Sequence, residues 1–177
     1  MEYIKCKYQL YKDEIFFTTI LPPTIVNTKY IHMSLKGVMT MKKGWAWDGC
    51  SGPTIDESWN QRSGCGHDGL YWLVRNGYLS KYSKPVIDRC FYKWLREDIE
   101  IIIDRMLKRL EIDKKEKSKY SIFNFTKKYM SYPIKKSMIK INKNLLLKRA
   151  KYYYWAVKKF GDPSIDPKNK RQKIIAP

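Results

Sequence analysis

Residues 31–53 read IHMSLKGVMTMKKGWAWDGCSGP, and this stretch decides the fold class. Every second residue from Ile31 to Leu35 is apolar, which is the pattern of a strand with one buried face. Gly37 interrupts the alternation, which then resumes and runs into a segment rich in glycine and tryptophan. The pattern predicts two antiparallel strands followed by a long, shaped loop, and such loops in compact domains usually have a function.

The residues before this stretch extend the predicted sheet. Apolar residues alternate loosely over residues 3–20, with a turn at Lys12-Asp13-Glu14, and this predicts a hairpin. Pro22 and Pro23 end it, because proline cannot donate a hydrogen bond to a strand ladder. We therefore expect the first 47 residues to form a small antiparallel sheet.

The residues after the stretch predict an irregular segment and then helices. Glycines and a proline interrupt residues 48–66, which we expect to form the loop. Three helices with apolar residues at helical spacing should follow. The sequence thus predicts an α+β fold, with a small N-terminal antiparallel β-sheet, a glycine-rich loop and packed α-helices. The first expected helix runs from His67 to Asn76 and is stopped by Gly77. The second is capped by Ser83, has Pro85 in its first turn and continues through Leu110. The third runs from Asn144, which serves as its cap, to Gly161.

Composition also divides the chain. Residues 113–143 are rich in lysine and aromatic residues and lack a clean helical period, so we interpret them as an insertion or arm. Residues 1–112 and 144–162 then form a single α+β domain. Residues 163–177 contain prolines and basic residues and should form an extended basic tail.

Net charge indicates the class of partner. The 177 residues contain 36 Lys+Arg against 17 Asp+Glu, a net charge of +19, and most of the excess follows residue 100. An anionic partner is expected, either nucleic acid or an anionic membrane surface, with other virion proteins as a further option. An aromatic fraction of 15% excludes wholesale disorder. The sequence shows no transmembrane segment or signal peptide, so we expect it in the cytoplasm of the producing host cell or in a virion.

The four cysteines, at positions 6, 50, 65 and 90, lack the paired spacing of a zinc site. We expect reduced thiols that pack as small apolar groups. The tryptophans at 45, 47 and 59 flank the glycine-rich loop, and they either pack in the core or form an interfacial lip.

The segment His67-Asp68-Gly69-Leu70-Tyr71 has the residues of a catalytic site. His67 and Tyr71 share a helix face at i,i+4, and an antiparallel second helix would bring Asp88 to within about 2.6–3.2 Å of the His67 ring. A histidine oriented by a carboxylate can act as a general base. The second carboxylate, Asp68, lies beside a loop of backbone carbonyls, and this combination suits Ca²⁺.

This arrangement resembles the phospholipase A2 pattern, and the parvoviral type is most similar in spacing. The resemblance implies that His67 is the general base, Asp88 its orienting partner and Tyr71 a hydrogen-bond donor to Asp88. It also implies a calcium site formed by Asp68 and the loop residues Asp48, Gly49 and Ser51. The cysteines that frame secreted phospholipases are absent: Ser63, Gly64 and Leu70 stand in their places.

A second resemblance covers more of the chain. Trp47-Asp48-Gly49-Cys50-Ser51, the His-Asp-x-x-Tyr motif, Asp88-Arg89 and the segment from Arg149-Ala150 to Gly161 resemble a small domain of unknown function. That domain occurs in tailed phages and prophages, so the resemblance implies a viral origin. It leaves 113–143 as an insertion.

Two functional hypotheses follow. The first is a phage-type viral protein with a phospholipase-like site that hydrolyses lipid esters with calcium. The second is a non-enzymatic basic virion or accessory protein that binds nucleic acid or another viral protein. A buried polar network of His67, Asp68, Tyr71 and Asp88 that links two helices is the structural alternative to catalysis.

Overall fold

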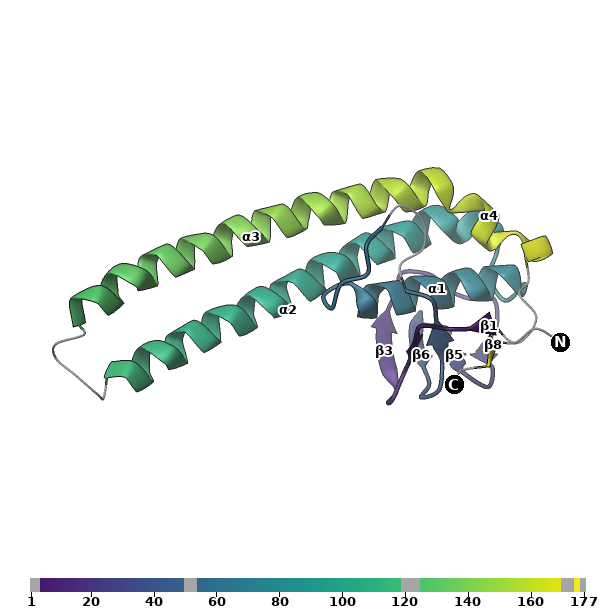
Figure 1. The fold of residues 1–177 in the computed structure, drawn as a ribbon. Coiled ribbons are helices and arrows are strands. Elements are labelled where there is room, and N and C mark those ends of the chain that lie inside the picture. The colour runs from purple at the N-terminus through teal and green to yellow at the C-terminus, as the bar shows by residue number, and fades with distance from the viewer. Residues whose placement is uncertain (1–3, 50–53, 119–124, 170–173, 176–177) are drawn as a thin grey trace.

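The computed structural model describes residues 4–49, 54–118, 125–169 and 174–175. It consists of a small α+β unit and a long hairpin of two helices that extends from it (Figure 1). We call the α+β unit the head; it comprises the strands, the first helix and the adjoining ends of the two long helices. The predicted α+β class is confirmed. Its helices are α1 (Gln61–Arg75), α2 (Lys84–Ser118), α3 (Phe125–Phe160) and the short α4 (Asp162–Ile165), with 3₁₀ turns η1 (Lys81–Ser83) and η2 (Pro167–Asn169). Its strands are β1 (Ile4–Lys5), β2 (Tyr8–Gln9), β3 (Glu14–Phe17), β4 (Val26–Asn27), β5 (Ile31–Met33), β6 (Val38–Met41), β7 (Ala46–Trp47) and β8 (Ile174–Ile175).

The main sheet is antiparallel and has the order β3-β6-β5-β4. The hairpin of β5 and β6 confirms the predicted alternation, and Gly37 takes a φ of +77° at its turn. Leu35 is an exception, because it lies in the turn and is exposed. The inner face of the sheet packs on α1 and α2 through side chains with at most 2% exposure: Phe16, Val26, Ile31, Met33, Met39 and Met41.

The predicted hairpin of residues 3–20 is wrong. Strand β2 pairs with β7, whereas β3 pairs with β6, so the two segments on either side of residues 12–14 have different partners. Asp13 explains the local geometry, since its carboxylate accepts a hydrogen bond from the Lys43 amide at 2.8 Å. The turn residues thus fix a contact distant in sequence rather than a tight hairpin.

Helix α1 starts six residues earlier than the sequence predicts, at Gln61 rather than His67. Gly66, near the start of this helix, serves packing rather than loop formation. A Cβ placed on Gly66 would lie 2.6 Å from a Phe16 ring carbon and 2.9 Å from a Trp94 ring carbon. Only a glycine lets α1 approach both rings this closely. As predicted, the helix ends before Gly77, whose φ is +79°.

Helix α2 follows α1 after a short connection. Pro85 occupies its first turn, as predicted. The side chain that caps the connection is Ser80, which accepts a hydrogen bond from the Tyr82 amide in η1, rather than Ser83.

Helices α2 and α3 run side by side and extend far beyond the head (Figure 1). The predicted start of the last helix at Asn144 is wrong, because Asn144 lies inside α3. The described parts of 113–143 are helical and continue α2 and α3, while the division of the chain into a domain and an arm stays a prediction. In the predicted tail, residues 163–165 belong to α4 and are helical rather than extended.

Two apolar clusters stabilise the molecule. One lies between the sheet, α1 and the start of α2, and the other joins α2 to α3 through side chains such as Phe91, Leu95, Leu146 and Tyr153. The three tryptophans that flank the loop are buried. Of the cysteines, Cys6, Cys65 and Cys90 are buried and in the thiol form, and position 50 lies outside the described residues. Within the described residues, no helix combines the length and hydropathy needed to cross a bilayer.

Candidate functional site

The structure brings His67, Tyr71 and Asp88 together in the interior of the head. His67 and Tyr71 lie one turn apart on α1, and Asp88 lies on α2. The Nε2 atom of His67 is 3.3 Å from Oδ1 of Asp88, just beyond the expected range, and the Tyr71 hydroxyl donates to the same oxygen at 2.7 Å. The predicted juxtaposition is therefore present, while the catalytic roles stay a prediction.

Lys84 completes this group and was not predicted. Its ammonium donates to Oδ2 of Asp88 at 2.9 Å, and it also donates to the backbone carbonyl of Val157 at 3.1 Å. A further ion pair joins it to Asp162 at 3.3 Å. Lys84 thus connects the start of α2 with the end of α3 and the start of α4. We call Lys84, His67, Tyr71 and Asp88 the root network.

Gly161 closes the root network from the side of α3. A Cβ at this position would collide with the Tyr71 hydroxyl oxygen and with the carbonyl oxygen of Val157. The sequence identified Gly161 as a helix stop, but its second role is to let the chain pass close to Tyr71.

Burial controls the protonation of the root network. It lowers the pKa of His67, and this effect outweighs the nearby Asp88 carboxylate. Burial alone would raise the pKa of Asp88, but the hydrogen bonds from His67, Lys84 and Tyr71 hold that pKa below its usual range. Burial and the Asp88 charge together raise the pKa of Tyr71. The network therefore contains a neutral imidazole and an ionised carboxylate at neutral pH.

The burial of this group suits a structural link between α1 and α2. With Asp88 ionised, the Nε2–H of His67 is its donor, so only Nδ1 is left to act as a base. His67 is 6% exposed, and its ring contacts those of Tyr71 and Phe91, at centroid distances of 4.0 and 4.6 Å. His67, Tyr71 and Lys84 all hydrogen-bond to the Asp88 carboxylate, and such satisfied partners stabilise a buried network.

The described residues that were predicted to bind calcium lie on different elements, α1 and the segment after β7. Asp68 is half-buried on α1, and Asp48 is half-buried just after β7. Gly49 is buried with a φ of +88°, and its Cα lies against the carboxylate of Asp56. Ser51 lies outside the described residues. Among the residues that the structure describes, no group of three or more His, Cys, Asp or Glu side chains is placed to hold a metal ion. The calcium site stays a prediction.

The sequence contains a pattern that indicates Lys84 as a partner of Asp88. Lys84 and Asp88 are spaced i,i+4, so they face each other on one helix. The carbonyl oxygens of α3 give no such signal, since their position depends on how α3 returns to the head.

A pH titration of stability should detect the buried histidine. The unfolded chain takes up a proton on His67 near its ordinary pKa of about 6.5, whereas the folded state resists it. The free energy of unfolding should therefore fall as the pH drops below about 6.5, by at most ~1.4 kcal/mol per pH unit from this residue. Urea titrations between about pH 7 and pH 5 measure the slope. His67→Asn should reduce it, and an equal slope in this variant would contradict the assignment.

Searches with the chain against protein-family models, curated proteins and solved structures returned no match.

Proposed function

We propose that this protein is a non-enzymatic binding protein whose hairpin binds an anionic partner through the outer face of α3. The observation that supports this function is the charge of the two long helices. Helix α3 has 11 Lys+Arg and no Asp or Glu, whereas α2 has 10 Lys+Arg against 8 Asp+Glu. The positive charge is therefore concentrated on one helix of the pair.

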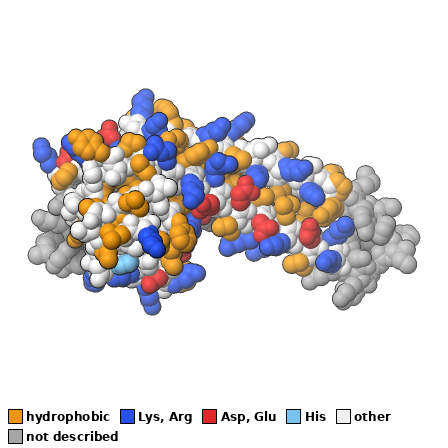
Figure 2. Space-filling view, turned by 180° about the vertical axis from the view of Figure 1, so that it is seen from behind, with side chains coloured by type: hydrophobic (Ala, Val, Ile, Leu, Met, Phe, Trp, Pro, Cys, Tyr) orange, Lys and Arg blue, Asp and Glu red, His pale blue; other side chains and the backbone are white. Residues whose placement is uncertain are grey.

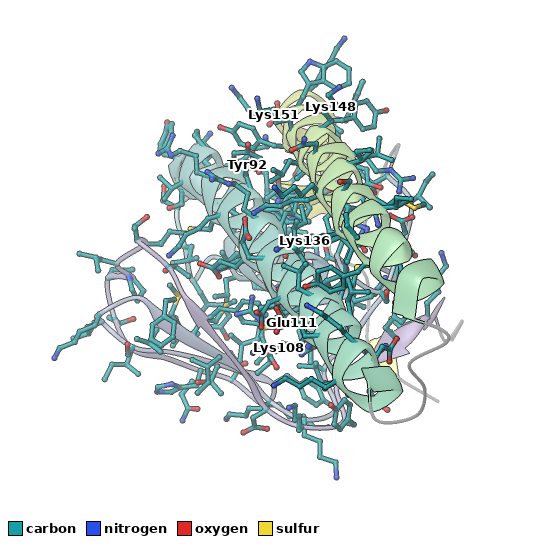
Figure 3. All side chains as sticks on the ribbon, turned by 90° about the vertical axis from the view of Figure 1, so that its left-hand side faces the viewer. Tyr92, Lys108, Glu111, Lys136, Lys148 and Lys151 are labelled. Carbon is teal, nitrogen blue, oxygen red and sulfur yellow. The ribbon has the colours of Figure 1, made fainter. Side chains whose placement is uncertain are left out.

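The inward cations of α3 already have partners. Lys143 forms an ion pair with Glu100 of α2 at 2.7 Å, and Arg149 forms one with Glu57 at 2.8 Å. In Figure 3, Lys148 and Lys151 lie on the side of α3 away from the sheet. Both are exposed. Further exposed lysines of α3 are Lys135, Lys136, Lys140, Lys158 and Lys159.

A row of exposed lysines without carboxylates creates a positive potential that attracts an extended anionic surface. Nucleic acid and anionic lipid bilayers both present such a surface. A basic virion or accessory protein would use this row in the same way for either partner.

Charge reversal on α3 tests the proposal. Lys148→Glu with Lys151→Glu should weaken binding to duplex DNA or to anionic vesicles, whichever the wild-type protein binds, by about tenfold or more at low salt. The matched control is Lys12→Glu with Lys36→Glu, which changes the net charge equally at exposed positions of the head. Fluorescence anisotropy and vesicle co-sedimentation measure the two affinities.

Equal losses in the two double variants would show that net charge alone matters and would contradict a binding face on α3. Wild-type protein that binds neither probe at low salt would reject the function altogether.

Lipid-ester hydrolysis by a phage-type protein is the second candidate function. The 3.3 Å and 2.7 Å contacts of Asp88 with His67 and Tyr71 favour it, because they match the arrangement that the phospholipase resemblance implies. The low exposure of His67 and the Lys84 ammonium on Asp88 favour the binding function instead. Hydrolysis of anionic phospholipid vesicles, with calcium and with chelator, tests this candidate, and no turnover in either condition would reject it.

A further inference from the structure

The outer face of α3 carries an apolar stripe as well as lysines. Its side chains follow one another at steps of three, four or seven residues, so they lie along one face of the helix. Each is between 45% and 68% exposed, which is unusual for side chains of this size in a helix that already has a buried seam on α2. We call these residues the outer stripe: Ile134, Met138, Ile141, Leu145, Tyr152 and Trp155.

Lysines accompany the outer stripe. Lys148 occupies the step between Leu145 and Tyr152, and Lys140 and Lys151 lie along one flank at nearly the same angle about the helix axis. At the base of the hairpin the Tyr152 and Trp155 rings stack at a centroid distance of 5.7 Å. Figure 2 shows hydrophobic, basic and acidic side chains interspersed along the hairpin as seen from behind.

A second copy of the chain is a poor occupant of this face. Self-association through α3 would place two helices with 11 Lys+Arg each, and no Asp or Glu, against each other. Like charges across an interface are repulsive and costly. The occupant must therefore be anionic.

Nucleic acid is also a poor match for the whole face. Phosphates bind the lysines, and bases can stack on Tyr152 and Trp155. The distal half of the stripe is aliphatic, however, with Ile134, Met138, Ile141 and Leu145. A duplex backbone would leave these four side chains against water or charged phosphates.

We propose that the outer stripe docks α3 on an anionic lipid bilayer, with the helix lying in the plane of the interface; this inference rests on the proposed binding function and names its partner. Apolar and aromatic side chains on one face, with lysines beside them, are typical of interfacial helices. Tyrosine and tryptophan favour the headgroup region, and long lysine side chains keep their ammonium groups in water.

The position of α3 in the molecule permits this contact. Figure 1 shows α3 along one edge of the molecule, with α2, α1 and the sheet all on its other side. A flat surface can therefore reach the outer stripe along the length of the helix, and the head then projects away from it.

Three double variants and three probes test the proposal. The probes are vesicles of equimolar phosphatidylglycerol and phosphatidylcholine, vesicles of phosphatidylcholine alone, and duplex DNA. Ile141→Ser with Leu145→Ser removes two stripe side chains, and Ile101→Ser with Ile112→Ser removes two comparably exposed apolar side chains from α2 as the control. Lys148→Glu with Lys151→Glu tests the charge. All these side chains are exposed, and circular dichroism checks the folds.

We expect wild-type protein to bind the anionic vesicles, and the stripe variant to bind them about tenfold or more weakly. The α2 control should bind as the wild type does. The stripe variant should leave any DNA binding unchanged. Equal binding of the wild type and the stripe variant to anionic vesicles would overturn the lipid assignment, as would stripe-dependent binding to DNA or self-association without vesicle binding. If the charge variant keeps full binding to every probe, the proposed function itself fails.

Discussion

Asp88→Ala is expected to lower the free energy of unfolding by about 3–5 kcal/mol, the usual cost of leaving a buried charge without its partner. Asp88 is 1% exposed and accepts hydrogen bonds from His67, Tyr71 and Lys84. Its removal leaves the buried Lys84 ammonium with only the largely exposed Asp162 as a carboxylate partner, and it leaves two neutral donors unsatisfied. For a chain of this length the melting temperature should fall by about 10 °C or more.

Asp104→Ala on the same helix is the control. Asp104 forms an i,i+4 ion pair with Lys108 at 2.8 Å, but its side chain is 58% exposed. Solvent screens such a pair, so the change in the free energy of unfolding should stay within about 0.5 kcal/mol. Similar melting temperatures for the two variants in differential scanning calorimetry would show that the root network does not stabilise the fold.

Gly66→Ala should destabilise the head by about 2 kcal/mol in urea unfolding. The new methyl group would overlap the rings of Phe16 and Trp94, which are 0% and 1% exposed and have no free space to enter. Overpacking of this kind costs about 1–3 kcal/mol or more. The higher helix propensity of alanine, worth about 1 kcal/mol, offsets only part of this cost.

Gly69→Ala provides the matched comparison on the same helix. A Cβ there would lie 2.6 Å from the Sδ atom of Met41, at the flexible end of that side chain. Met41 can change rotamer, so the variant should be as stable as the wild type or more stable by up to about 1 kcal/mol. If both alanine variants lose stability equally, the close approach of α1 to Phe16 and Trp94 is not the cause.

Local patterns predicted the parts of the fold in which neighbours in sequence are neighbours in space. The alternation from Ile31 to Met41 predicted the β5–β6 hairpin, since its two strands pair directly. The spacing of His67, Tyr71 and Asp88 predicted the core of the root network, because α1 and α2 are joined by a short connection.

Contacts distant in sequence were not predictable in this way. Residues 3–20 resemble a hairpin, but β2 pairs with β7 and β3 with β6, some 20 to 40 residues later, and β1 pairs with β8 near the end of the chain. The glycines at 64 and 66 resemble a loop, because the sequence does not reveal the Phe16 and Trp94 rings that require a glycine at position 66. The first half of α3 was not recognised as a helix because both its inner face and its outer stripe are apolar. Its apolar residues therefore lack the helical periodicity of an ordinary surface helix, which is apolar on one face.

The same reasoning applies to the candidate site. Asp88 was identified with its histidine and tyrosine, but the cation that holds it was not. Lys84 gains its carbonyl acceptors only when α3 returns to the head, more than 70 residues later. A buried network can thus resemble a catalytic constellation in sequence, because both need the same residue types at the same spacing.

The length of the hairpin can vary independently of the head. The packed positions of α3 include Ile139, Leu146, Ala150 and Tyr153, which follow steps of seven, four and three residues. Adding or removing seven residues in each of the two helices would shift the tip by about 10 Å and restore the same seam. Lys84 joins the start of α2 to the end of α3, because it bonds both Asp88 and the Val157 carbonyl. The length of the helical hairpin can therefore change over evolution, or by engineering, while the head keeps its structure.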